Sequence, residues 1–381
     1  MKKHLCGAML GAAALSAAAP SQAQSTSSVT LYGIVDVGVG YERVDGPNGF
    51  SRSSTGMVDG VNSGSRFGVR GVEDLGDGTR AIFTLEAGFN ASNGESGQGG
   101  RLFGRRATVG LQNDGWGTLE VGRQTNLAST WIGDSASPFG TSWRTANIGT
   151  TFSAANTMRL DNLVLYQSPT YGGFQFGLGY SFNADDTRTA NNGQQTGFGT
   201  GDNNRLLTTA LRYSSGPLYL AAAYDRFNPT NDAVGGKSDA RIQSLILGGT
   251  YDFEVAKLAL AWGQTRDGWF IGQTMGTSPD DGGFTDLGTF SLADGFKVNS
   301  TLLGVTVPFG QTSLLASWQR ADPNNDSLTG DDATMNVYSI GVMHNLSQRT
   351  NLYAYTSYGD NYAFNRDASN RTVVAGIRHR F

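Results

Sequence analysis

Short stretches of alternating apolar and polar residues recur along most of this chain. Residues 174–182 show the pattern most clearly, as Phe-Gln-Phe-Gly-Leu-Gly-Tyr-Ser-Phe. Similar alternation occurs over residues 218–224, 257–263 and 372–381. Because successive side chains of a strand point to opposite faces, a period of two predicts β-strands with one apolar face and one polar or small-residue face. Beyond residue 23 the chain shows no convincing amphipathic helix.

Short and long connections alternate strictly between these predicted strands. The seven short connections fall at residues 73–78, 113–117, 168–173, 214–217, 252–255, 308–311 and 345–350. The eight long, polar connections fall at residues 44–64, 91–100, 124–158, 184–204, 228–240, 266–294, 322–333 and 360–370. Fifteen connections join 16 strands. An even strand count with short periplasmic turns and long extracellular loops is typical of an all-β, antiparallel transmembrane barrel, and a barrel of ~16 strands encloses water.

The composition agrees with a barrel and excludes other classes. Hydrophobic residues make up 38% of the 381 residues, 54 residues are Gly, and there is one Cys. These values exclude a bundle of membrane-spanning helices and a disulfide-stabilised fold. A closed barrel satisfies its backbone groups between strands and turns half of its side chains toward water, so it needs no continuous apolar segment.

The N-terminus has the features of a secretory signal peptide. Lys2 and Lys3 precede an apolar stretch, residues 5–19, and the small residues Ser21 and Ala23 suit cleavage after residue 23. We therefore expect residues 1–23 to be a cleaved signal peptide and residues 24–381 to form one barrel domain in the envelope of a Gram-negative cell.

Several segments together resemble a known family. They are Val29-Thr30-Leu31-Tyr32-Gly33, residues 65–76, Gly122-Arg123-Gln124, Asp161-Asn162, residues 346–350 and the terminal Phe381. In this order they resemble the general porins of Neisseria- and Burkholderia-type Proteobacteria, over the whole predicted mature chain. The resemblance implies a homotrimer of 16-stranded barrels, each with its third loop folded into the lumen as a constriction. Resemblance to outer-membrane proteins in general implies that Phe381 is an assembly signal for the barrel-assembly machinery.

Residues 124–158 form the candidate constriction loop. The segment lacks a strand pattern but contains several large apolar residues: Trp131, Ile132, Pro138, Phe139, Trp143, Ile148 and Phe152. Long loops in compact proteins are usually functional or disordered. So many apolar side chains would not remain in water, and we expect this loop to pack against the lumen wall.

The charged residues suggest how such a pore would select solutes. Alternation predicts that Arg66, Arg80, Arg106 and Arg159 face the lumen, and the resemblance places basic wall residues at Arg66, Arg106, Arg123 and Arg159. Arg123 faces inward only if a bulge occurs near Gly122. Asp134 and Asp161 are the acidic candidates. We expect an arginine-rich constriction that favours anions modestly, although the net charge of -4 draws cations to the mouth. The alternative for each arginine is a rim position that binds lipopolysaccharide phosphate or a neighbouring loop.

The sequence thus predicts an outer-membrane porin for passive diffusion of small hydrophilic solutes and ions. A substrate-specific channel, a barrel adhesin or receptor, and an outer-membrane hydrolase are the alternatives. An enzyme is disfavoured because His344 and His379, the two histidines beyond residue 23, share the predicted lipid-facing side, and no catalytic or metal-binding motif occurs. We expect no cofactor, no metal and no nucleic acid. The expected partners are outer-membrane lipid, lipopolysaccharide, the assembly machinery and two further copies of the chain.

Overall fold

The fold is known from a computed structural model, which describes residues 27–185, 203–230, 240–273 and 287–381. The predicted signal peptide, residues 1–23, lies outside the described residues, as do parts of the long connections after β8, β10 and β12.

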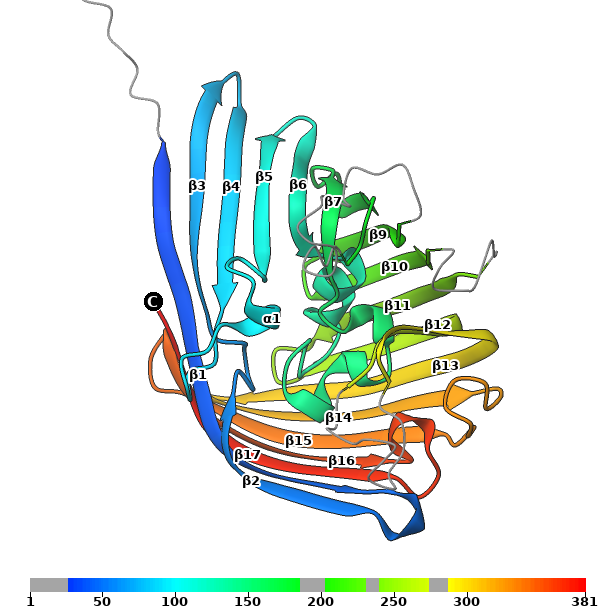
Figure 1. Ribbon diagram of the computed structural model, residues 1–381. Helices are drawn as coiled ribbons and strands as arrows, with labels where there is room; N and C mark the ends of the chain where they lie inside the picture. The colour runs from blue at the N-terminus through cyan, green and yellow to red at the C-terminus, as the bar shows by residue number, and fades with distance from the viewer. Residues whose placement is uncertain (1–26, 186–202, 231–239, 274–286) are drawn as a thin grey trace, which may run out of the picture.

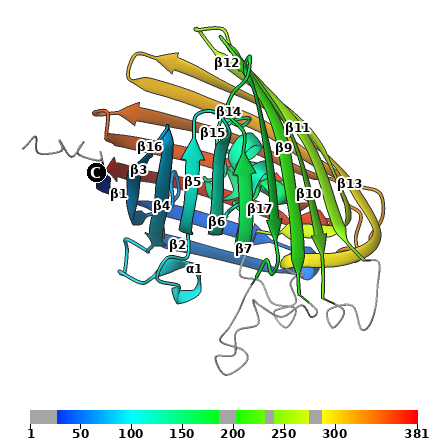
Figure 2. The ribbon, with the colours of Figure 1, turned by 90° about the horizontal axis from the view of Figure 1, so that it is seen from above.

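The described residues form one antiparallel sheet that curls into a ring (Figure 1, Figure 2). The strands of its first half are β1 (Ser28–Asp45), β2 (Ser51–Asp59), β3 (Arg66–Gly76), β4 (Thr79–Gly88), β5 (Arg106–Asn113), β6 (Gly117–Thr125), β7 (Arg159–Gln167) and β8 (Phe174–Ser181). The second half comprises β9 (Arg205–Ser215), β10 (Leu218–Asn228), β11 (Ile242–Asp252), β12 (Lys257–Ile271), β13 (Thr289–Phe309), β14 (Thr312–Pro323), β15 (Met335–Asn345), β16 (Thr350–Asp360) and β17 (Ser369–Arg380).

The ring closes where the last strand pairs with the first. β1 pairs with β17 from Ile34↔Arg380 to Asp45↔Ser369. On its other edge, β1 pairs with β3 near its start and with β2 near its end. Since β2 and β3 occupy one edge in succession, they act as a single strand interrupted at residues 60–65, and the barrel has 16 strands as predicted. The described part of the chain contains no helix of the length and apolar character that crossing a membrane would require.

The connections differ in places from the prediction. All seven short connections join the neighbouring strands between which they were predicted. The expectation of a loop over residues 44–64 was wrong, because η1 (Pro47–Gly49) makes a tight turn and β2 continues the sheet. The predicted loop 266–294 was too long, since β12 runs to Ile271 and β13 begins at Thr289. Strands that extend beyond the membrane have polar, Gly-containing ends, and their composition is the same as that of a loop.

The two faces of each strand have the predicted character. On β8 the side chains of Phe174, Phe176 and Leu178 are 51%, 42% and 44% exposed and point outward, where lipid would cover them. The positions between them are inward-facing small or polar residues. The apolar face therefore lies on the outside of this fold, which is the reverse of a water-soluble protein.

The connection between β6 and β7 lies inside the ring and fills part of it. It contains four short helical turns, η2 (Ala128–Gly133), η3 (Arg144–Ala146), η4 (Ile148–Thr150) and η5 (Ser153–Ala155). Trp131, Ile132, Phe139 and Phe152 of this connection are at most 3% exposed. Trp131, Ile132 and Phe152 pack on the inner faces of β9 to β12, whereas Phe139 packs with Leu315 of β14 and with Tyr353 and Tyr355 of β16. The turn η3 contacts β15 and β16. We call residues 126–158 the inner loop.

Glycines on the inner face provide the space for the inner loop. A Cβ at Gly304 of β13 would lie 2.5 Å from Pro138 Cδ, and a Cβ at Gly248 of β11 would lie 3.0 Å from Ala136 Cβ. Corresponding contacts involve Gly177 with Leu127 and Trp131, Gly263 with Phe152, and Gly341 with Phe139. Part of the glycine excess thus allows the inner loop to lie flat against the wall.

Hydrogen bonds attach the inner loop to the wall at two places, on β9 and β10 near its start and on β14 farther along. Asn126 donates to Asp225 Oδ1 of β10 over 3.0 Å, and the Leu127 amide donates to Thr208 Oγ1 over 3.1 Å. Farther along, the Gln319 amide of β14 accepts from Thr151 over 2.8 Å and donates to the Ala146 carbonyl over 2.9 Å.

Candidate functional lumen

A cavity of about 930 Å³ lies between the inner loop and the wall formed by the first half of the sheet. Its lining is strongly basic. Among the described residues, seven arginines and two carboxylates line it: Arg66, Arg105, Arg106, Arg144, Arg159, Arg212 and Arg378, with Glu86 and Asp134.

One carboxylate on the wall serves two of these arginines. The Glu86 side chain points inward from β4, and its Oε1 accepts from Arg105 Nε over 2.6 Å. Arg66 Nη1 lies 3.8 Å from the same oxygen, and the Tyr32 hydroxyl donates to Glu86 Oε2 over 3.0 Å. Two positive charges therefore share one negative charge, and the group keeps a net positive charge.

Arg106 and Arg159, the other predicted wall residues that line this cavity, differ in whether a carboxylate balances their charge. Arg106 Nη2 donates to both oxygens of Glu120, over 2.6 and 2.7 Å, so its charge is compensated within the wall. The guanidinium of Arg159, at the start of β7, forms no hydrogen bond or ion pair with any side chain or backbone group that the structure describes. The charges that act on its guanidinium are the like charges of Arg105, Arg123 and Arg66 and the opposite charge of Glu86. Arg159 thus presents an uncompensated positive charge to the cavity.

Arg123 faces inward through a break in the strand register. The pairing of β6 with β7 shifts between Gly122 and Gln124, and Gly122 has a φ of +130°, which favours glycine. Arg123 Nη1 donates to Asp161 Oδ1 over 2.6 Å, and Arg101 Nη1 lies 2.8 Å from both Asp161 oxygens. Asp161 is therefore enclosed by two arginines, and neither it nor Arg123 lines the cavity.

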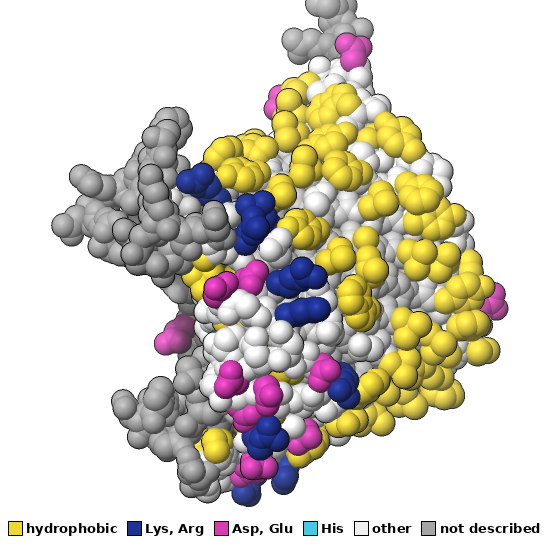
Figure 3. Space-filling view, turned by 90° about the vertical axis from the view of Figure 1, so that its right-hand side faces the viewer, with side chains coloured by type: hydrophobic (Ala, Val, Ile, Leu, Met, Phe, Trp, Pro, Cys, Tyr) yellow, Lys and Arg dark blue, Asp and Glu magenta, His cyan; other side chains and the backbone are white. Residues whose placement is uncertain are grey.

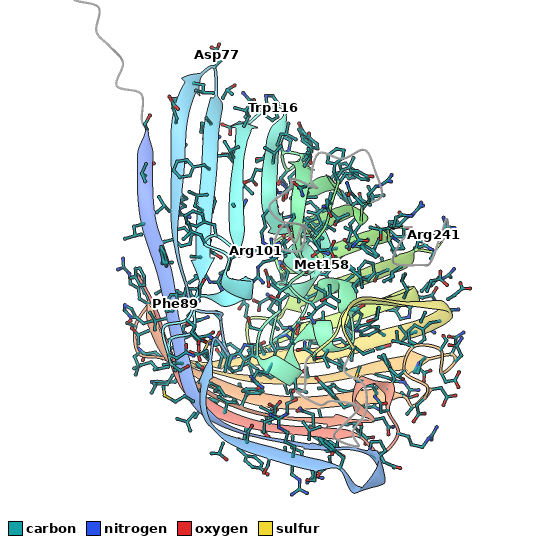
Figure 4. The ribbon with its side chains drawn as sticks, in the orientation of Figure 1. Asp77, Phe89, Arg101, Trp116, Met158 and Arg241 are labelled. Atoms are coloured by element: carbon teal, nitrogen blue, oxygen red, sulfur yellow. The ribbon has the colours of Figure 1, made fainter. Side chains whose placement is uncertain are left out.

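Arg80 lies away from the cavity. Its guanidinium forms an ion pair with Asp114, next to the short turn between β5 and β6. Asp77 and Trp116, at the tips of the first two short turns, lie far from Arg101 and Met158 inside the ring (Figure 4). Alternation predicts the face of the sheet on which Arg80 lies, but it does not predict its height along the barrel.

Asp134, the last predicted charge, lies on the inner loop at the end of η2 and borders the cavity. Its Oδ1 accepts from Thr141 Oγ1 over 2.6 Å. The carboxylate reaches the water of the cavity, yet the surrounding protein removes part of its hydration and raises its pKa. The Thr141 hydrogen bond and the charges of Arg66, Arg105 and Arg159 oppose this shift.

Sequence reasoning missed several lining residues. Arg105 precedes β5, so alternation does not cover it. Glu86 lies six residues after Arg80 on β4, so alternation alone could have placed it on the inner face. Arg212 stacks over the Trp131 ring at 4.5 Å, and Arg378 donates to Asn62 Oδ1 over 2.8 Å. Alternation along β9 and β17 already places both on the inner face, so that pattern alone could have identified them.

The histidines take part in strand pairing near the short turns. His344 Nδ1 lies 2.8 Å from Thr312 Oγ1, and His379 Nδ1 lies 2.8 Å from Thr350 Oγ1. Within the described ranges, no cluster of three or more His, Cys, Asp or Glu side chains could hold a metal ion.

Comparison with known proteins identifies the family. The model of the Gram-negative porin family matches residues 9–363. The chain belongs to this family. An outer membrane porin protein of Bordetella pertussis is 52% identical over the full length of both chains. Outer membrane porin protein 32 of Delftia acidovorans is 33% identical, over 97% of this chain and 91% of its own.

A solved structure supports the same conclusion. An anion-selective porin from Comamonas acidovorans aligns with a TM-score of 0.69 and 28% identity, covering 93% of this chain and 100% of its own. The predictions of an outer-membrane location, a barrel fold and a channel for small hydrophilic solutes and ions are thereby confirmed. The porin is a channel rather than a member of an enzyme family.

Proposed function

We propose that the porin prefers anions over cations and that its selectivity arises in the cavity beside the inner loop. The excess of seven arginines over two carboxylates in the lining carries this proposal. Arg66, Arg105 and Arg159 form the basic side of the constriction, with Arg106 beside them in its ion pair with Glu120, and Asp134 lies opposite on the inner loop. Fixed charges in a narrow aqueous passage set ion preference through the local potential. The relative from Comamonas acidovorans, described as anion-selective, is consistent with this reading.

The remaining predicted residues take supporting positions in this proposal. Arg123 and Asp161, together with Arg101, fix the segment between β4 and β5 against the wall, and the net charge of this triad is positive. Arg80 is balanced by Asp114 and makes no contribution to the constriction.

We further infer that residues 1–23 are cleaved on export and that the mature porin is a homotrimer without catalytic activity. Lipopolysaccharide surrounds its outer rim, and the barrel-assembly machinery recognises the segment that ends at Phe381. The matching family and the envelope location support these inferences.

A sugar-specific channel is less well supported. Tyr353 and Tyr355 face inward, as alternation predicts, but each is only 3% exposed. The Trp143 ring of the inner loop covers them at centroid distances of 5.2 and 5.4 Å. They are therefore part of the packing under the inner loop and cannot offer their faces to a sugar.

The proposal is tested by replacing the uncompensated arginine. A unit charge ~4 Å from an ion in water contributes ~1 kcal/mol, which corresponds to about a fivefold change in relative permeability. We expect Arg159→Gln to lower the chloride-to-potassium permeability ratio by about that factor, measured as the reversal potential in a potassium chloride gradient. Arg80→Gln is the matched control and leaves the ratio unchanged. An anion preference that survives the loss of Arg159, Arg66 and Arg105 together would refute the proposal.

A further inference from the structure

A row of cations lies on the outer face of the barrel, on the parts of β9, β10, β12 and β13 that are nearer the long connections and directly before β11. It consists of Arg205, Arg226, Arg241, Arg266 and Lys297. Each cation lies an even number of residues from an exposed apolar side chain of its strand, or of the strand that follows it in the case of Arg241, and so shares the face of that side chain. These apolar side chains are Leu211, Leu220, Leu245, Trp262 and Leu303, respectively. Figure 3 shows basic side chains in a diagonal row along the border of the apolar face, with acidic side chains on the side of the loops.

The row brings like charges together across neighbouring strands. Arg266 is directly opposite Lys297 in the pairing of β12 with β13. Gln243 of β11 lies between Arg226 and Arg266, so these two arginines are separated by two strand spacings, about 10 Å. Like charges directly opposite each other destabilise a sheet when nothing compensates them.

The described part of the chain supplies no such compensation. No described carboxylate forms an ion pair with any of the five cations. The nearby Asp267 and Asp294 lie on the loop side of the row, and Asp267 Oδ1 accepts from the Gly295 amide over 3.1 Å. Arg226 Nε is buried without a hydrogen-bond partner.

Two outward arginines elsewhere on the rim have carboxylate partners. Arg320 on β14 lies 3.2 Å from Asp322, and Arg43 on β1 lies 2.9 Å from Asp45. Arg371 on β17 lies over the Tyr358 ring at 5.6 Å. Arg371 lies directly opposite Arg43 in the pairing of β1 with β17. Among the described residues, the outward arginines of β1 and β14 thus have carboxylate partners, which the five cations of the row lack.

The position of the row suggests the nature of its missing partner. Two residues farther from the long connections, about 7 Å along each strand, the same outer face carries other side chains. These are Tyr224 next to Arg226, Gln264 next to Arg266 and Asn299 next to Lys297. The outer face thus passes from apolar side chains through aromatic and amide groups to cations. This is the order of acyl chains, interface and phosphate groups in a membrane leaflet.

We propose that Arg205, Arg226, Arg241, Arg266 and Lys297 form a docking surface for the phosphate groups of lipopolysaccharide in the outer leaflet. The cations contact the phosphates directly, because no described carboxylate in the row is placed to share a divalent cation with them. This inference rests on the proposed association with lipopolysaccharide and locates it. It is independent of the ion preference of the pore.

The test measures binding of purified bisphosphorylated lipid A to the detergent-solubilised porin by native mass spectrometry. At ~1 kcal/mol for each cation, the triple variant Arg226→Gln/Arg266→Gln/Lys297→Gln should bind about 100-fold more weakly. The matched control is Arg43→Gln/Arg320→Gln/Arg371→Gln, on the same rim, which should bind within about threefold of the wild type. Single-channel conductance equal to that of the wild type shows that both triple variants are folded.

Binding experiments with the wild-type porin and other ligands identify the group that is recognised, and they do not require a variant to fold. Lipid A with one phosphate should bind more weakly than lipid A with two, inorganic phosphate should compete poorly, and EDTA should have no effect. Equal losses in the two triple variants, equal binding of lipid without phosphate, or loss of binding in EDTA would each overturn the proposal. Reversal potentials that remain anion-selective in the row variant would show that the pore proposal stands independently.

Discussion

At the scale of single residues, the lumen contains more positive charge than its carboxylates can balance. Glu86 serves both Arg66 and Arg105, while Arg159 has no partner among the described residues. Asp134 is then the carboxylate whose titration changes the charge of the cavity most directly, because its one hydrogen bond comes from a neutral hydroxyl.

Anion preference should therefore increase as the pH falls. Because the pKa of Asp134 is raised, its carboxylate takes up a proton at a higher pH than an ordinary aspartate, whose pKa is about 3.9. Protonation removes a negative charge, so the chloride-to-potassium permeability ratio should rise between neutral pH and about pH 4. Asp134→Asn should show the higher ratio already at neutral pH and lose this step. A pH profile identical in wild type and variant would assign the titration to another group.

At the scale of elements, the position of the inner loop depends on small residues of the wall that it covers. At Gly304 an added side chain would meet Pro138 in the middle of the inner loop. We expect Gly304→Val to displace the inner loop from β13 and to alter single-channel conductance and its noise. Overpacking of this kind costs about 1–3 kcal/mol of stability. Gly56→Ala on β2, where nothing lies within 4 Å of the new Cβ, is the control. Equal conductance traces for the two variants would contradict this role of Gly304.

The inner face of the strands could be predicted from the sequence, but the height of a residue along the barrel could not. Alternation placed Arg66, Arg106 and Arg159 on the inner face because a strand turns successive side chains to opposite sides. It could not show that Arg80 lies at a turn and Arg159 beside the inner loop, since height depends on strand stagger around the barrel. The apolar residues of the inner loop predicted that it packs, but its contacts with β9 to β12 depend on closure of the ring. Glu86 and Arg105 meet only through that three-dimensional arrangement.

At the scale of the whole molecule, the terminal residue joins the two ends of the chain. The Phe381 amide and carbonyl exchange hydrogen bonds of 3.1 Å with Gly33 of β1, and the Phe381 ring occupies the space that a Cβ at Gly33 would need. These contacts complete the seam between β1 and β17. Phe381 thus has a structural role besides the proposed role in assembly, and the two roles can be separated.

Deletion of Phe381 should lower the yield of folded porin in cells far more than it lowers the stability of the refolded barrel. Two hydrogen bonds at a strand end contribute about 1–2 kcal/mol together, a small part of the pairing along the seam. The proposed recognition by the assembly machinery, in contrast, should be lost entirely. The folded fraction is measured in cells by heat-modifiable migration, and unfolding in detergent is measured with urea. Gly33→Val is the complementary variant: it keeps Phe381 but displaces its ring, so it should weaken the seam in both settings. If deletion of Phe381 reduces yield and stability in parallel, its role is confined to the seam and the assembly signal lies elsewhere in β17.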